Sequence, residues 1–297
     1  MGNVKITGLQ ARHYQRDTDE VLKEALKEWD RTQRREDKRA KQVIEFDRGP
    51  IGLALMADLH FGSPGTDYGR VFADAELIAK TEGMYAGTVG DLVDNFILAK
   101  LAHARRDNRL LIEDEWTLVK KFMSLIGPKL LLAVGGNHDY WTRLAAGIDF
   151  FTEILNGINP DALYDEDDSR VTIKIGAVSW PGRIRHKWRG ASIYNETHGI
   201  ERAGKWDHDF VWGVGAHTHV SGLARQFNNS GENGLALLCG AYKRVDKYAR
   251  SHGFVKANQS AAVAIIFDER NGSMQGFNDL NLAARILTAL RAYGRKK

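Results

Sequence analysis

The twelve residues LLLAVGGNHDYW, at positions 130–141, join an apolar run to a cluster of polar side chains. The five apolar residues at 130–134 are typical of a buried strand. Two glycines then lead the chain directly to Asn137, His138 and Asp139. Ligands gather at the carboxyl ends of strands in α/β folds, so this arrangement indicates a functional site at the edge of a sheet.

Three more predicted buried strands end in the same kind of residues. In chain order, the four strand ends carry Asp58 and His60, Asp91 and Asp94, Asn137 and His138, and His217 and His219. In D-x-H and H-x-H the two side chains are two residues apart, which places both on one face of a strand. Carboxylate and imidazole ligands together suit Mn, Fe or Zn rather than calcium alone. The sequence therefore predicts a metal centre.

The order of strands and helices predicts an α/β fold. Helical patterns occur at residues 67–83, 94–106, 113–126, 191–204 and 281–294. In the first half, strands alternate with helices, which predicts a sheet covered on both faces. The second half is rich in strands, one of them over residues 170–179, and predicts a second sheet. We therefore expect one domain of two packed sheets flanked by helices.

The N-terminal part of the chain has a different character. Residues 17–41 predict a charged helix that Asp17 or Thr18 could cap. An apolar stripe marks its first half and is formed by Val21, Leu22, Ala25, Leu26 and Trp29. Its second half is charged all round. The helix either docks by its first turns or serves as a basic nucleic-acid-binding arm. We divide the chain into this extension, residues 1–42, and a domain over residues 43–297.

Composition excludes several classes of protein. No stretch approaches the ~20 apolar residues of a membrane span, and the N-terminus lacks a signal-peptide core. The single cysteine, Cys239, excludes an internal disulfide and fits a reducing compartment, so we expect a cytoplasmic protein. The formal net charge of +4 is compatible with an anionic substrate.

Together the four strand ends resemble the motifs of the calcineurin-like metallophosphoesterase superfamily. They read D-x-H at 58–60, G-D-x-x-D at 90–94, G-N-H-D at 136–139 and A-H-x-H at 216–219. The resemblance covers roughly residues 51–220 and implies a four-layer αββα sandwich around two metal ions. One residue departs from the pattern, because Ala216 stands where the family has glycine and Gly215 lies one place earlier.

The resemblance implies a ligand for each metal position. Asp58, His60 and His219 would hold the first ion, Asn137, His217 and a lone histidine the second, and Asp91 would bridge both. Chain order leaves His186, His198 and His208 as candidates for the lone histidine. We expect His186, which lies in a glycine-flanked stretch after the strand at 170–179. The ions are two divalent metals, with Mn expected and Fe or Zn as alternatives.

The resemblance also implies roles for three residues that do not bind metal. His138 would protonate the leaving group or stabilise charge in the transition state. Asp139 would hold the His138 imidazole in orientation. Asp94 would orient ligands without binding a metal itself.

The family implies phosphoester hydrolysis by a hydroxide that two metal ions activate. Asn95-Phe96 and Asp139 replace the Arg-Gly and Glu of the protein phosphatases, which disfavours that branch. Arginines near His186 could contact phosphate, and the neighbouring Trp188 and Tyr194 could stack on bases, as could Tyr140 and Trp141 beside the third motif. The arginines in question are Arg183, Arg185 and Arg189. Structural roles for all these side chains remain the alternative.

Three functions stay open from the sequence. The first is a phosphodiesterase or nuclease acting on DNA, RNA or a nucleotide, similar in its motifs to the repair exonucleases of the family. The second is a small-molecule or nucleotide phosphomonoesterase with the same site. The third is a non-catalytic binding module, which the intact set of ligand types argues against. The sequence leaves the oligomeric state open.

Overall fold

The structure is a computed structural model that describes residues 17–39, 42–98, 108–190, 192, 194–229, 231–244 and 260–294. The chain divides into two compact units, residues 1–41 and 42–297. The strand that opens the second unit begins at Gln42, one residue before the boundary we expected.

The described part of the first unit is helix α1 (Thr18–Arg39). Asp17 caps it, because its carboxylate accepts hydrogen bonds from the backbone N–H groups of Asp19 at 2.8 Å and Glu20 at 3.1 Å. Of the two caps that the sequence allowed, the structure therefore selects Asp17. The helix ends at Arg39, and residues 40 and 41 of the predicted helix lie outside the described residues.

The second unit contains two six-stranded mixed sheets. The first has, in spatial order, β12 (Ser273–Phe277), β11 (Val263–Asp268), β2 (Ile51–Met56), β3 (Met84–Val89), β4 (Leu130–Val134) and β5 (Leu163–Asp165). The second has β1 (Gln42–Phe46), β6 (Ser169–Ile175), β7 (Val178–Ile184), β8 (Trp212–Gly215), β10 (Glu232–Leu238) and β9 (Leu223–Asn229). Strands β2, β3, β4 and β5 are parallel, so their carboxyl ends meet at one edge.

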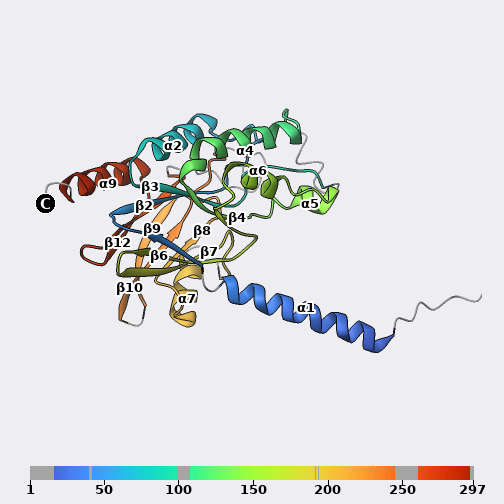
Figure 1. Ribbon diagram of the computed structural model, residues 1–297. Coiled ribbons are helices and arrows are strands. Elements are labelled where there is room, and N and C mark those ends of the chain that lie inside the picture. The colour runs from blue at the N-terminus through green and yellow to red at the C-terminus, as the bar shows by residue number, and fades with distance from the viewer. Residues whose placement is uncertain are drawn as a thin grey trace, which may run out of the picture. The chain divides into compact units, whose positions relative to one another are not determined.

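The helices complete four layers, as predicted. They are α2 (Tyr68–Lys80), α4 (Ile112–Ile126), α5 (Trp141–Ala146), α6 (Phe150–Ile158), α7 (His198–Asp207) and α9 (Leu280–Gly294), with a short 3-10 turn η2 (Gly127–Lys129). Figure 1 shows α2, α4 and α9 over the sheet that contains β2, and α7 beside the other sheet. No helix of the described residues is long and apolar enough to cross a membrane.

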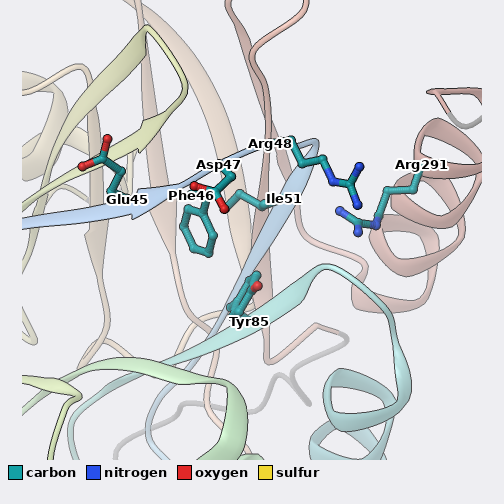
Figure 2. A pocket seen from close by; sticks show the side chains of 7 residues that line it. All are labelled: Glu45, Phe46, Asp47, Arg48, Ile51, Tyr85 and Arg291. Carbon is teal, nitrogen blue, oxygen red and sulfur yellow. The ribbon is translucent and has the colours of Figure 1, made fainter. Parts of the chain in front are cut away.

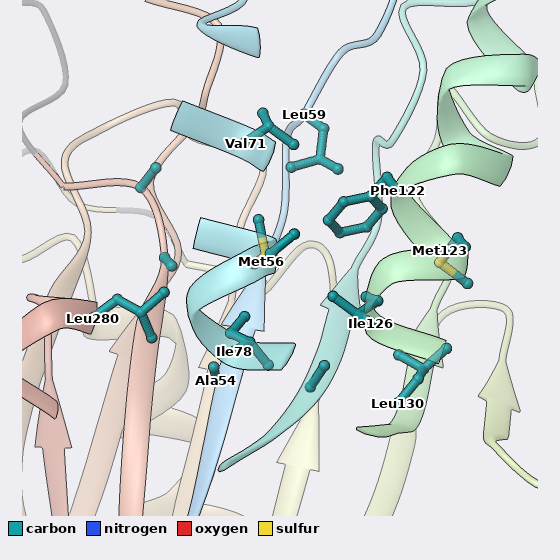
Figure 3. Close-up of a cluster of buried hydrophobic side chains, with 14 of the residues drawn as sticks. Ala54, Met56, Leu59, Val71, Ile78, Phe122, Met123, Ile126, Leu130 and Leu280 are labelled. Carbon is teal, nitrogen blue, oxygen red and sulfur yellow. The ribbon is translucent and has the colours of Figure 1, made fainter. Parts of the chain in front are cut away.

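The continuous apolar run of β2 is explained by its place between two layers. Its side chains alternate, so that Leu53 and Leu55 pack against the second sheet while Ala54 and Met56 face the helices. The helix-side cluster also takes Phe122 from α4 (Figure 3). Both faces of the strand are thus dry, as expected for a parallel sheet covered on both sides.

Several sequence predictions about individual elements are wrong. The single strand expected at 170–179 is the hairpin β6–β7, because Gly176 turns the chain with a φ of +56°. The helix expected at 94–106 is absent from residues 94–98, where Asn95 has a left-handed φ of +47°; residues 99–106 lie outside the description. The helix expected near 191–204 begins only at His198.

The two halves of the sequence do not correspond to the two sheets. Strand β1 joins the sheet of the second half through parallel pairing with β6, whereas β11 returns from the C-terminal part to pair with β2. Strands β5 and β12 were not predicted at all. Both are short, and β12 alternates exposed and half-buried residues, which gives a weak apolar signal.

We expect Phe122→Ala to lower the free energy of unfolding by about 3–5 kcal/mol, because the ring is fully buried and the change leaves a cavity. Leu144→Ala is the matched control, since that side chain is 73% exposed, and should change stability by less than about 0.5 kcal/mol. Chemical denaturation measures both. Equal losses from the two variants would contradict the assigned core.

Candidate metal centre

Six of the predicted ligands lie where strands β2, β3, β7 and β8 end, and most of them have left-handed backbone. Seven non-glycine residues of the described chain have positive φ, and five of them are candidate ligands. These five are Asp58, His60, Asp91, His217 and His219. Left-handed backbone is uncommon outside glycine and persists only where the surroundings hold it, so the loops at this edge are strongly constrained.

The first group of donor atoms consists of Asp58, His60 and His219. The Nε2 atoms of the two histidines lie 3.0 Å apart. Asp58 Oδ1 lies 3.4 Å from His219 Nε2 and 3.8 Å from His60 Nε2. One ion can therefore be reached by all three side chains, as predicted for the first metal.

The second group consists of Asp91, His186 and His217. His186 Nε2 lies 3.1 Å from Asp91 Oδ2 and 3.2 Å from His217 Nδ1. The structure thus brings His186 to the site. The other two candidates for the lone histidine are exposed on α7, His198 at its first residue and His208 at its C-cap.

Hydrogen bonds on the far side of each ring fix which nitrogen faces the site. His60 Nδ1 lies 3.0 Å from Asp94 Oδ1, and His186 Nδ1 lies 2.7 Å from the carbonyl oxygen of Val89. Both acceptors take the Nδ1–H, which leaves the Nε2 lone pair for a metal. Asp94 also accepts from Lys243 Nζ at 2.9 Å and from Asn108 at 3.0 Å, so its position suits the orienting role predicted for it.

Each of the two central carboxylates has one oxygen fixed and one directed at the donor atoms. Asp58 Oδ2 accepts from the backbone N–H of His217, and Asp91 Oδ1 accepts from that of His138, both at 2.9 Å. Asp58 Oδ1 is buried and has no hydrogen-bond partner among the described residues. A buried carboxylate oxygen without a donor is costly, and a cation satisfies it. The donor set therefore fits divalent metal ions.

The bridging role of Asp91 stays a prediction. Its Oδ1 accepts the His138 N–H at 2.9 Å, and its Oδ2 lies 3.1 Å from His186 Nε2. A bridge through Oδ2 would use that one oxygen for both ions.

Burial and neighbouring charge set the protonation of these groups. Burial lowers the pKa of His60 to about 4, so its ring is neutral near neutral pH. Burial alone would raise the pKa of Asp91, but the charges of His186 and His138 hold it well below its usual value. Burial would lower the pKa of His186, but the Asp91 carboxylate raises it to about 10.

His138 lies beside the donor groups with one nitrogen free to face them. Its Nδ1 is 2.6 Å from the carbonyl oxygen of Asp94, and its Nε2 is 3.9 Å from Asp91 Oδ2. The side chain is 13% exposed. The group that orients the imidazole is therefore a backbone carbonyl.

The role predicted for Asp139 is wrong. Both of its oxygens accept backbone N–H groups, from Asp91, Leu92 and Gly136, each at 2.9 Å, so neither is left to hold the imidazole. Burial and the nearby Asp91 charge raise the pKa of Asp139 to about 7, while the three donors favour its ionised form. Asp139 ties the second and third motif loops together.

These loops approach so closely that glycine is required at Gly136. A Cβ there would lie 2.2 Å from both the backbone nitrogen and Oδ1 of Asp91. Ala216, which replaces the family glycine, causes no comparable conflict. It is not among the residues with positive φ, and its N–H donates to the carbonyl oxygen of His186 at 3.0 Å.

The arginines predicted to contact phosphate have different environments. Arg183 is buried and bonds both oxygens of Asp168, at 2.9 and 2.7 Å, and Asp207 at 2.6 Å, so that prediction is wrong for this residue. Arg185 is half-buried near Trp188, and Arg189 is exposed. Asn137 is exposed at its strand end, and its role as a ligand stays a prediction.

Sequence reasoning missed Lys243 and undervalued Asn95. Lys243 is buried and bonds Asp94, and Asn95 bonds the carbonyl oxygen of His138 through its amide at 2.6 Å. The signal for Lys243 was a fifth buried strand, GLALLCG, that also ends in polar residues. Asn95 directly follows G-D-x-x-D, but we used it only to exclude one branch of the family.

A cavity of about 320 Å³ lies elsewhere in the molecule. Figure 2 shows Arg48 and Arg291 side by side at this cavity, with Tyr85 below them. Ile51, the first residue of β2, lines it, whereas Asp58 follows the other end of that strand, roughly 20 Å away by strand length. The cavity is therefore separate from the metal centre.

No protein-family model and no curated protein matches the sequence. Among solved structures, the chain is similar to a candidate 5′-nucleotidase from Staphylococcus aureus, with 10% identity and a TM-score of 0.42 over 77% of this chain and 53% of that one. Vps29 from Entamoeba histolytica, complexed with Zn²⁺, has 11% identity and a TM-score of 0.37 over 76% and 97%.

A nuclease MPE from Pseudomonas putida has 13% identity and a TM-score of 0.35, over 76% of this chain and 87% of that one. The aligned region thus spans about half of the nucleotidase chain and most of the other two. These likenesses are distant.

Asp139→Asn should reduce both stability and metal content. The amide would turn an N–H donor toward backbone N–H groups that now have a charged acceptor, and the loss should be about 3 kcal/mol. Denaturation and elemental analysis of the purified variant measure the two effects. If the variant keeps its metal and its stability but loses turnover, Asp139 orients the His138 imidazole after all, which would contradict the present assignment.

Metal binding should strengthen as pH rises. With its pKa raised to about 10, His186 is protonated at pH 7 in the metal-free protein, and a metal must displace that proton from Nε2. Affinity should therefore rise up to about tenfold per pH unit below pH 10 if one proton is released. Titration calorimetry in two buffers of different ionisation enthalpy measures the number of protons released when the metal binds.

The exposed His198 provides the control for this experiment. His198→Gln should release as many protons as the unmodified protein, whereas His186→Gln should release fewer. Affinity that is flat from pH 6 to 8 would show that the metal displaces no proton from His186.

Proposed function

We propose that this protein is a phosphodiesterase that acts on DNA, RNA or a nucleotide. It would use two divalent metal ions, with Mn expected at both positions and Fe or Zn as alternatives. The observation that carries the proposal is the position of His138 Nε2, 3.9 Å from Asp91 Oδ2 and so at the rim of the two donor groups. An imidazole in that place can donate a proton to a phosphoester oxygen held by the centre.

The chain's own residues divide the work of hydrolysis. When bound, the ions would supply Lewis-acid stabilisation of the phosphoryl oxygens and a nucleophile derived from water. Asp58, His60 and His219 would hold one ion, and Asp91, His186 and His217 would hold the other, with Asn137 as a predicted addition. His138, which the Asp94 carbonyl oxygen orients, would face the departing oxygen.

The choice of a diester rests on the basic and aromatic side chains that the sequence offers for nucleic-acid contact. Arg183 does not count among them, because Asp168 and Asp207 neutralise its guanidinium. Arg185 lies half-buried beside Trp188, and Trp141 lies beside His138. The motif set supports hydrolysis as the reaction class, and a phosphomonoesterase is the alternative that the following test separates.

The test compares bis(p-nitrophenyl) phosphate with p-nitrophenyl phosphate, in added Mn and in chelator. We expect chelator-sensitive hydrolysis of the diester and little of the monoester. On thymidylyl-thymidine, whose alkoxide leaving group needs a proton, His138→Ala should retain its metal and lose about 10²- to 10⁴-fold in kcat, the usual contribution of general acid catalysis. His198→Ala, an exposed histidine on α7, is the matched control and should keep full activity.

Hydrolysis of the monoester alone would replace the proposal with the phosphomonoesterase. Full activity of His138→Ala would remove the role given to that histidine. A metal-loaded protein that hydrolyses neither ester would support the non-catalytic binding module.

A further inference from the structure

Two aromatic side chains lie against His138. The ring of Trp141 lies 4.0 Å from that of His138, centroid to centroid, and the ring of Phe96 lies 5.5 Å from it. Phe96 and Trp141 are 5.8 Å apart, with their planes inclined by 33°. The three rings thus form a compact triangle, which we call the aromatic wall.

The two aromatic residues of the wall are not part of a core. Both are half-buried, and neither belongs to the hydrophobic clusters formed by the described residues. A Phe and a Trp that are partly open to water beside a candidate active site can present aromatic surface to a substrate.

Buried polar contacts hold the wall in place. Asn95, next to Phe96, donates its amide to the His138 carbonyl oxygen at 2.6 Å and accepts from the hydroxyl of Thr142, next to Trp141, at 2.8 Å. The backbone N–H of Asn95 donates to Glu115 at 2.7 Å. Asn95 is fully buried in the left-handed region, with φ at +47°. This strained residue therefore fixes both rings relative to the imidazole.

A positive charge completes this side of the site. The ammonium group of Lys243 lies 5.5 Å from the centroid of Phe96 and 2.9 Å from Asp94 Oδ1. The cation orients the Phe96 ring through its π face.

The chemistry of the proposed reaction gives this wall a use. If His138 protonates the departing oxygen, the leaving group must lie next to the rings that surround His138. Flat rings bind other flat rings by stacking, and a nucleobase stacks on them whatever its identity. An aliphatic alcohol offers no such surface.

We propose that Phe96 and Trp141 form a binding platform for the leaving group, and that this group is a nucleoside whose base stacks on them. This inference rests on the proposed function and adds the substrate class on the leaving side. It makes the two residues determinants of specificity.

The test uses two diesters that differ only on the leaving side. One is thymidylyl-thymidine, and the other carries an abasic tetrahydrofuran in place of the released thymidine. The unmodified, Mn-loaded protein should prefer the first by about 10- to 100-fold in kcat/KM. Phe96→Leu keeps apolar volume without a flat ring and should reduce the preference to about threefold or less.

Matched variants separate stacking from support of His138. Trp206→Leu removes an aromatic side chain that is 75% exposed on α7, and should leave the preference unchanged. Trp141→Leu should lower the ratio of the two kcat/KM values. Loss of support for His138 alone would reduce both values by the same factor and leave their ratio unchanged. Free thymidine should also inhibit the unmodified protein more strongly than abasic deoxyribose, a readout that needs no variant to fold.

Each outcome decides between the accounts. Equal rates on the two diesters, or cleavage of bis(p-nitrophenyl) phosphate without cleavage of either, would overturn the platform and leave the phosphodiesterase standing. A preference unchanged in both Phe96→Leu and Trp141→Leu would also overturn it. No hydrolysis of any diester by the metal-loaded protein would overturn the proposed function itself.

Discussion

The carboxylate of Asp139 is the contact on which the site depends. It accepts three backbone N–H groups, two from the loop after β3 and one from the loop after β4. Those donors come from buried loops that water does not reach, so no other group would satisfy them. By fixing the two loops, Asp139 sets the distance between Asp91, a candidate ligand, and His138, the proposed general acid.

The same kind of contact recurs around the centre. The backbone N–H of His217 fixes Asp58, and that of His138 fixes Asp91, so each ligand is held by the loop of another motif. These contacts hold loops in which five candidate ligands occupy left-handed backbone, a conformation that costs roughly 1–3 kcal/mol per residue. Phe96 and Trp141 are attached to the same network through Asn95.

The sequence predicted this site better than its surroundings. The meeting of Asp58 and Asp91 follows from strand ends, because the parallel strands β2 and β3 bring their carboxyl ends together. The four-layer sandwich and the choice of His186 came from the family resemblance and the order of the histidines in the chain. The pairing of β11 with β2 did not follow, since long-range pairing leaves no local pattern. Side-chain contacts between residues that are distant in the sequence were missed for the same reason. Arg183 resembled a phosphate ligand until Asp168 and Asp207 were seen to neutralise it.

The central claim is that two adjacent groups of side chains bind two metal ions. Anomalous X-ray scattering from crystals of the Mn-loaded protein tests it most directly. The account predicts two peaks, one among Asp58, His60 and His219 and the other beside His186 and His217, with Asp91 Oδ2 between them. A single peak, or a metal coordinated by Asp94 in place of these residues, would contradict the account.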